Sequence, residues 1–198
     1  MNFLRWVVIS CFFLTTPVWP ALVTDQGSVY FSPDDNLEKR LVHLIEEENK
    51  SIYVAIYCLT HREIGEALIK AKKRGVDVQV IVDKYSLKMK SPLAKMVDSG
   101  ISVSVWDSKG PGNKNNTRAL MHNKFCVLGD EIVWTGSFNF TYQADRVHQE
   151  NVIVLKNSEM ATEFKKQFNH IKMRGCLPFS SYITYNPHKL SKKHTQKR

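Results

Sequence analysis

Cysteine is scarce in this chain, because its 198 residues contain only four. Their spacing matches no metal-binding pattern, so we predict neither a metal site nor a cofactor. Cys58 and Cys126 fall on segments that read as core strands, which is typical of buried apolar thiols. If the compartment is oxidising, a disulfide between two of the cysteines is the alternative.

Long apolar runs are also missing. The N-terminal run from Trp6 to Leu14 is about nine residues long, shorter than a membrane-spanning helix requires. It follows Arg5 and is succeeded by two prolines, so residues 1–24 are predicted to be a secretory signal peptide. The protein would then be exported, to the periplasm or the medium; the alternative is that this segment is kept as a membrane anchor.

Acidic residues are outnumbered, with 19 Asp and Glu against 28 Lys and Arg, a net charge of +9. This excess favours a polyanionic partner, either nucleic acid or an anionic lipid surface. The alternative is a soluble basic protein with a cationic tail. Residues 176–198 read as such a tail, which carries Lys189, Lys192, Lys193, Lys197 and Arg198.

Internal repeats are absent, and residues 25–175 read as one domain. Strand patterns alternate with helix patterns in its first half, which predicts an α/β fold: a mixed, mostly parallel β-sheet flanked by helices on both faces. Ser32, followed by Pro33, is expected to cap the first helix. The expected strands are 28–31, 52–59, 76–82, 101–106, 121–128, 131–135 and 150–155, and Ser158 is expected to cap the last helix.

One segment combines residues suited to chemistry on a phosphate. His122 and Lys124 are two apart on a predicted strand, so their side chains share one face. If that strand and the next form a hairpin through Gly129-Asp130, the following turn, with Ser137 and Asn139, returns beside them.

This set offers one nucleophile, His122, and three groups that could bind phosphate oxygens: Lys124, Ser137 and Asn139. A reaction at phosphorus that uses no metal fits a histidine nucleophile, which forms a covalent phosphohistidine. Gly136 is expected to let the backbone approach a ligand closely. The plainer interpretation is a solvated strand edge followed by an ordinary turn.

A histidine on a strand needs a partner for its second ring nitrogen. Glu150, at the start of the next predicted strand, is the candidate to orient His122. The alternative is that Glu150 is an exposed acid at a strand end.

The stretch "MHNKF…TGSFNFT" resembles the H-x-K signature of the phospholipase D superfamily. "IYVAIYCLT" and "ALIKAKKRGVDVQVIVD" resemble its small bacterial endonucleases, which carry a single motif, and the likeness spans about residues 29–171. The resemblance implies that His122 is the nucleophile, that Lys124, Ser137 and Asn139 bind phosphate, and that Glu150 in "HQENVIV" supports the histidine.

One position departs from that signature. The family usually has aspartate five residues after the lysine, where this chain has Gly129, followed by Asp130. Either Asp130 substitutes after a shift of one residue in the turn, or the carboxylate is absent. Because this position lies at the far end of the strand, we expect altered stability rather than lost catalysis.

The resemblance also implies an assembly. The family's site uses two motifs and this chain has one, so we expect a two-fold homodimer whose composite active site contains His122 from both chains. One histidine would attack phosphorus while the other serves as general acid.

Two substrates and one non-enzymatic function stay open. The net charge and the loop of residues 107–118, with substrate-binding candidates Lys109, Lys114 and Arg118, favour a sequence-nonspecific endonuclease on DNA or RNA. The first alternative is a phospholipase D or cardiolipin hydrolase acting on phospholipids. The second is a nucleic-acid-binding protein with a weakened site, which only Gly129 supports.

Overall fold

A computed structural model describes residues 23–24, 26–107 and 119–183. The three loop candidates Lys109, Lys114 and Arg118 lie outside these residues, as does nearly all of the predicted signal segment. Within the described ranges, no helix is both long and apolar enough to cross a membrane.

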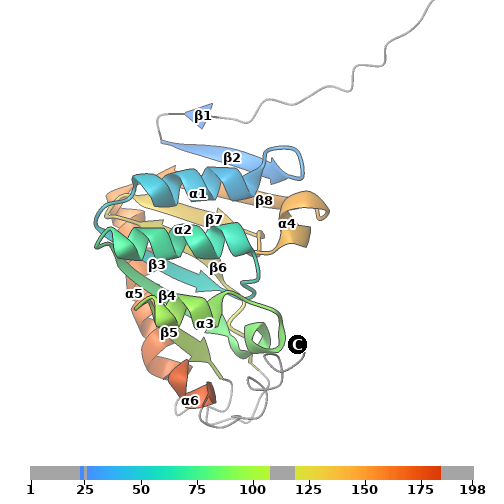
Figure 1. Ribbon diagram of the computed structural model, residues 1–198. Helices are drawn as coiled ribbons and strands as arrows, with labels where there is room; N and C mark the ends of the chain where they lie inside the picture. The colour runs from blue at the N-terminus through green and yellow to red at the C-terminus, as the bar shows by residue number, and fades with distance from the viewer. Residues whose placement is uncertain (1–22, 25, 108–118, 184–198) are drawn as a thin grey trace, which may run out of the picture.

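The described chain builds one nine-stranded sheet in the order β1-β2-β8-β7-β6-β3-β4-β5-β9 (Figure 1). The strands are β1 (Val23–Thr24), β2 (Gly27–Ser32), β3 (Ser51–Ile56), β4 (Asp77–Asp83), β5 (Ser102–Trp106), β6 (Lys124–Leu128), β7 (Ile132–Gly136), β8 (Glu150–Lys156) and β9 (Cys176–Pro178).

The α/β class and the mixed sheet are confirmed, but the sheet is mostly antiparallel rather than mostly parallel. Only β3, β4 and β5 pair in parallel, and a helical connection leads from β3 to β4 and from β4 to β5. The hairpin β6–β7, and the pairings of β8 with β7 and with β2, are antiparallel. Strands and helices alternate only in the first half of the sequence, so the prediction of parallel pairing does not hold for the second half.

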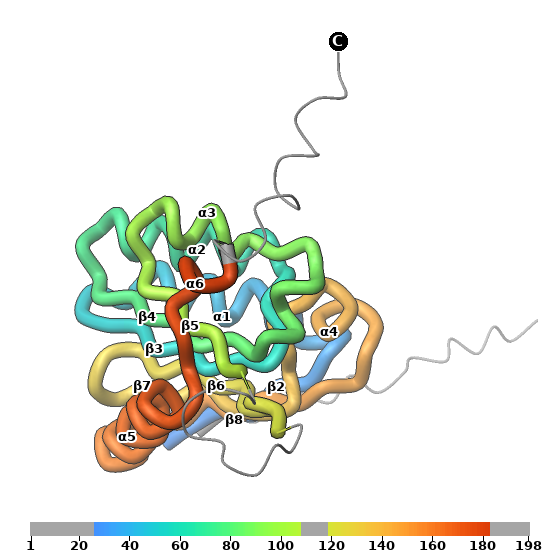
Figure 2. Tube along the Cα trace, turned by 90° about the horizontal axis from the view of Figure 1, so that it is seen from below, coloured from blue at the N-terminus to red at the C-terminus, as the bar shows by residue number. Residues whose placement is uncertain are grey.

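Helices cover both faces of the sheet, as expected. On one face lie α1 (Leu37–Glu47), α2 (Arg62–Lys73) and α3 (Leu93–Asp98), and on the other lies α5 (Ser158–Gly175) (Figures 1 and 2). The short helices are the 3-10 turn η1 (Lys84–Lys88), α4 (Tyr142–Arg146) and α6 (Ser180–Ile183).

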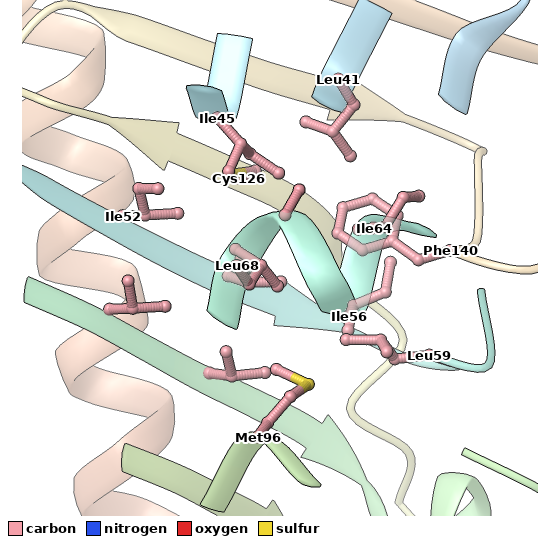
Figure 3. Packing of buried hydrophobic residues seen from close by; sticks show 14 of the residues in the cluster. Leu41, Ile45, Ile52, Ile56, Leu59, Ile64, Leu68, Met96, Cys126 and Phe140 are labelled. Atoms are coloured by element: carbon pink, nitrogen blue, oxygen red, sulfur yellow. The ribbon is translucent and has the colours of Figure 1, made fainter. Parts of the chain in front are cut away.

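Strand alternation divides the core into two layers. In β6, Cys126 and Leu128 pack on the side of α1 and α2, while Phe125 and Val127 pack on the side of α5. Figure 3 shows the first layer, in which Ile45 of α1, Leu68 of α2 and Cys126 belong to one apolar cluster. Cys58 and Cys126 are free, buried thiols.

The first helix is not capped as the sequence suggested. Ser32 ends β2, and α1 begins five residues later, behind Asn36 in the left-handed region with a φ of 51°. The Ser32 hydroxyl donates to the His148 carbonyl oxygen and accepts from the Glu150 N–H, at 2.8 and 3.1 Å. A tertiary partner has therefore taken the group that would have made a local cap.

The fold continues beyond residue 175. Cys176–Pro178 forms β9 and pairs antiparallel with β5, and α6 follows. Residues 176–183 therefore belong to the folded domain and not to a tail. A three-residue edge strand is too short for its periodicity to be recognised in the sequence.

Candidate active site

Register brings the candidate residues into one row across the sheet. Ile56 pairs with Lys124, Phe125 pairs with Thr135, and Gly136 pairs with Val152. The ends of β3, the start of β6, the end of β7 and the start of β8 therefore meet at one edge. This edge lies on the side of the molecule that carries α4 (Figure 1).

His122 and Lys124 form the centre of this edge. The Lys124 ammonium lies 3.1 Å from His122 Nδ1 and donates to the His122 carbonyl oxygen at 2.9 Å. The imidazole is exposed and lies against the ring of Tyr57, with centroids 4.7 Å apart. A ring held beside a cation, with solvent access, is suited to attack an anionic substrate.

A buried carboxylate fixes the segment that leads into His122. Asp83, at the end of β4, accepts a hydrogen bond from the Met121 N–H at 2.9 Å. Its other oxygen accepts from the Tyr85 N–H at 2.8 Å. Residues 119–123 precede β6 without regular structure, so this carboxylate supplies the anchor that a strand would otherwise provide.

Ser137 and Glu150 form the second part of the site. The Ser137 hydroxyl donates to Glu150 Oε2 at 2.5 Å and accepts from the Asn151 N–H at 3.0 Å. The structure therefore pairs Glu150 with Ser137, and the described residues show no hydrogen bond between Glu150 and His122. The charge of Glu150 acts on Lys124 instead.

Gly136 allows a close approach within the sheet that the sequence did not predict. A Cβ built on it would lie 2.1 Å from the Asn151 carbonyl oxygen, so its missing side chain admits β8. The same carbonyl accepts from the Ser137 N–H at 3.0 Å. The glycine permits close approach of a neighbouring strand, which in turn positions Ser137.

The loop that carries Asn139 crosses from β7 to the end of β3. The chain after β7 runs over to the end of β3, where the Phe140 N–H donates to the Cys58 carbonyl oxygen. The Asn139 Oδ1 atom is enclosed and has no hydrogen-bond partner in the described part of the chain. Such an atom costs roughly 1–3 kcal/mol of stability unless a ligand or a second subunit satisfies it.

The comparison with protein families agrees with this geometry. The family described as "cardiolipin synthase, PLD-like domain" matches residues 41–172, which include the strands and loops of the site up to α5. The chain belongs to the phospholipase D superfamily. It is accordingly a phosphodiester hydrolase, as the sequence resemblance implied.

Relatives and solved structures share most of the fold. Phospholipase D of Rickettsia bellii is 34% identical over 149 residues, which are 75% of this chain and 70% of that protein. Mitochondrial cardiolipin hydrolase of Chlamydomonas reinhardtii is 26% identical over 133 residues, 67% of this chain and 56% of that protein. Nuc from Salmonella typhimurium, a phospholipase D family member, superimposes with a TM-score of 0.68 at 27% identity, covering 77% and 97% of the two chains. NucT from Helicobacter pylori superimposes with a TM-score of 0.69 at 26% identity, and the match covers 78% of this chain and 99% of NucT.

The departure from the phospholipase D signature lies away from the site. Gly129 is in the β6–β7 turn, at the other end of β6 from Lys124, and has a φ of +56°. A Cβ there would lie 2.7 Å from a Glu48 carboxylate oxygen. Asp130 instead faces the ammonium groups of Lys50 and Lys165, at 3.3 and 2.8 Å. No carboxylate in this turn reaches His122.

The polar side chains of the site are those of His122, Lys124, Ser137, Asn139 and Glu150, which include one imidazole and one carboxylate. Among the described residues, no group of three or more His, Cys, Asp or Glu side chains is arranged to hold a metal ion.

The protonation of Lys124 gives the first prediction. Burial lowers its pKa below the ordinary lysine value of 10.5, and the negative charge of Glu150 opposes that shift. If the ammonium binds phosphate, kcat/KM should therefore fall on the alkaline side at a pH below 10.5. Glu150→Gln removes the opposing charge and should move this alkaline limb to lower pH. A pH–rate profile of both proteins measures the displacement, and a limb that moves to higher pH in the variant contradicts it.

Proposed function

We propose that the protein hydrolyses phosphodiesters without a metal, through a phosphohistidine intermediate on His122. The observation that supports this most directly is the Lys124 ammonium 3.1 Å from the His122 ring, on a sheet edge that also carries Ser137 and Glu150. The lysine offsets the charge of a phosphodiester and stabilises the negative charge that develops on its oxygens.

The reaction has two balanced steps. In the first, an unprotonated nitrogen of His122 bonds to phosphorus, and the bond from phosphorus to the leaving oxygen breaks. A protonated imidazole gives that oxygen its proton. In the second, the same imidazole, now neutral, takes a proton from water as the water oxygen attacks phosphorus, and the bond to His122 breaks.

The second imidazole requires a second copy of the chain. Among the residues of the described site, His122 is the single histidine, and the two steps need one neutral and one protonated ring. We infer a two-fold homodimer in which His122 of the partner subunit acts as general acid and then as general base. The two rings would titrate as one coupled unit. Two copies each of Lys124 and Asn139 would surround the phosphoryl group.

Nucleic acid is the substrate class that we favour. The net charge of +9 suits a polyanion, and the neighbours named Nuc and NucT are covered to 97% and 99% of their lengths. Binding through phosphates predicts low sequence preference and strong salt dependence. Export through the N-terminal segment remains part of this proposal.

Phospholipid is the second candidate. It is favoured by the identity of 34% with a rickettsial protein named phospholipase D, which exceeds the identity with either Nuc-type structure.

One assay separates these functions. The full chain is incubated in EDTA with single-stranded DNA, duplex DNA, RNA and vesicles that contain phosphatidylcholine and cardiolipin. We expect cleavage of nucleic acid, undiminished by EDTA, and no lipid turnover. Lipid hydrolysis without nucleic-acid cleavage overturns the substrate assignment, and activity that returns only with added zinc or magnesium overturns the mechanism.

A further inference from the structure

We propose that a pocket beside His122 binds the base of an unpaired nucleotide next to the scissile phosphate. This rests on the proposed nuclease function and deepens it, because it assigns the enzyme to single-stranded nucleic acid. The pocket is lined by Tyr57, Asp83, Lys84, Tyr85, Lys88, Trp106, Asp107, Ala119 and Leu120.

The pocket adjoins the nucleophile through one shared ring. Tyr57 lines the pocket, and its ring centroid is 4.7 Å from that of His122. Leu120, another lining residue, is two positions before His122 in the chain. A group in the pocket therefore lies next to a phosphate held at the imidazole.

An aromatic stack forms one wall. Tyr57 and Tyr85 are parallel within 6°, with centroids 5.4 Å apart. Tyr85 is 41% exposed, a large open area for an aromatic side chain, and Tyr57 is its one aromatic ring partner among the described residues. A planar base can continue this stack, since every base has a π-face.

The charges of the pocket suit a nucleotide. Lys84 is paired with Asp107 at 2.5 Å, so its charge is already balanced. Lys88 is exposed and forms no ion pair within the described residues, which leaves its ammonium for a phosphate that neighbours the base. The Asp107 carboxylate, which also accepts from the Tyr182 hydroxyl at 3.2 Å, adds an acceptor at the wall.

The walls are held before any ligand arrives. The Trp106 indole N–H donates to the Ala119 carbonyl oxygen at 3.3 Å, and Gly175 packs against the same indole. Asp83 fixes the backbone at Tyr85 and at Met121. A preformed pocket loses less conformational freedom when it binds.

These features favour a base over an acyl chain, which would require a continuous apolar lining instead of lysine and aspartate among the rings. They also favour single strands over duplexes, because a base paired within a duplex cannot enter a side pocket unless it is first unstacked and unpaired.

The test compares substrates that differ only in their bases. The full-length protein and Tyr85→Ala are assayed on a single-stranded DNA oligonucleotide, on its duplex, and on an oligomer of equal length in which every residue is abasic. Tyr85→Ala should lower the ratio of kcat/KM for the base-bearing strand to that for the abasic oligomer about tenfold. The preference of the wild type for single strands should shrink by the same factor.

Tyr85→Phe keeps the ring and should keep the ratio. Tyr142→Ala, at another exposed tyrosine that does not line the pocket, is the matched control.

Equal losses on the base-bearing and abasic strands overturn the base pocket and leave the nuclease standing. Cleavage of none of the three substrates by the wild type overturns the nuclease and the pocket together. Hydrolysis of phosphatidylcholine–cardiolipin vesicles that Tyr85→Ala abolishes would assign the pocket to a lipid instead.

Discussion

His122→Asn should reduce phosphodiester hydrolysis by at least about 10³-fold, because it removes the atom that bonds to phosphorus. The fold should survive, since the imidazole is exposed and its contacts with Tyr57 and Lys124 lie at the surface. We expect the free energy of unfolding in urea to change by no more than about 0.5 kcal/mol. His43→Asn, the same change at an exposed histidine on α1, is the control and should keep full activity.

Subunit exchange tests the composite site with the same variant. When wild type is equilibrated with excess His122→Asn, every mixed dimer has one imidazole and lacks either the nucleophile or the acid. Activity should then fall as the square of the wild-type fraction. A linear fall, or full turnover by an isolated monomer, shows that each chain works alone.

Gly136→Ala should lower kcat/KM by about 10²-fold, because its Cβ would lie 2.1 Å from the Asn151 carbonyl oxygen. β7 and β8 must separate to admit it. That separation breaks the bond from the Ser137 N–H to Asn151 and displaces the Ser137 hydroxyl from Glu150. We also expect a loss of about 1–3 kcal/mol in stability.

Gly27→Ala separates the two effects. Its Cβ would lie 2.7 Å from the Val154 carbonyl oxygen, so it strains β8 in a similar way, but Gly27 pairs with Leu155, at the end of the strand away from Glu150. It should lose stability and keep its activity. If both variants lose activity in proportion to stability, Gly136 has no special part in positioning Ser137.

The sequence predictions were most reliable for features that depend on residues close together in the chain. The sequence pattern assigned Cys58 and Cys126 to the core and predicted a hairpin through Gly129-Asp130, as burial and the β6–β7 register confirm. These features depend on neighbours a few residues away in the chain, so the sequence contains them.

Predictions failed where a side chain found a distant partner instead of a local one. Ser32 was expected to cap α1, but it binds the chain around Glu150. The α1 terminus is held by Asp145 of α4, whose carboxylate accepts from the Glu38 N–H at 2.8 Å. The intervening separations are more than a hundred residues, and no local pattern encodes them.

The site shows the same division. The sequence determined the chemistry, because the side chains of His122, Lys124, Ser137 and Asn139 are of types that bind or attack phosphate. It also predicted that a hairpin of β6 and β7 would bring them together. Only the tertiary structure showed that Glu150 accepts a hydrogen bond from Ser137, that Gly136 admits the neighbouring strand β8, and that Tyr57 and Tyr85 stack in a pocket beside the imidazole. The physical reason is that residue types fix which bonds a group can make, whereas the partner it bonds depends on which distant strand ends the sheet places next to it.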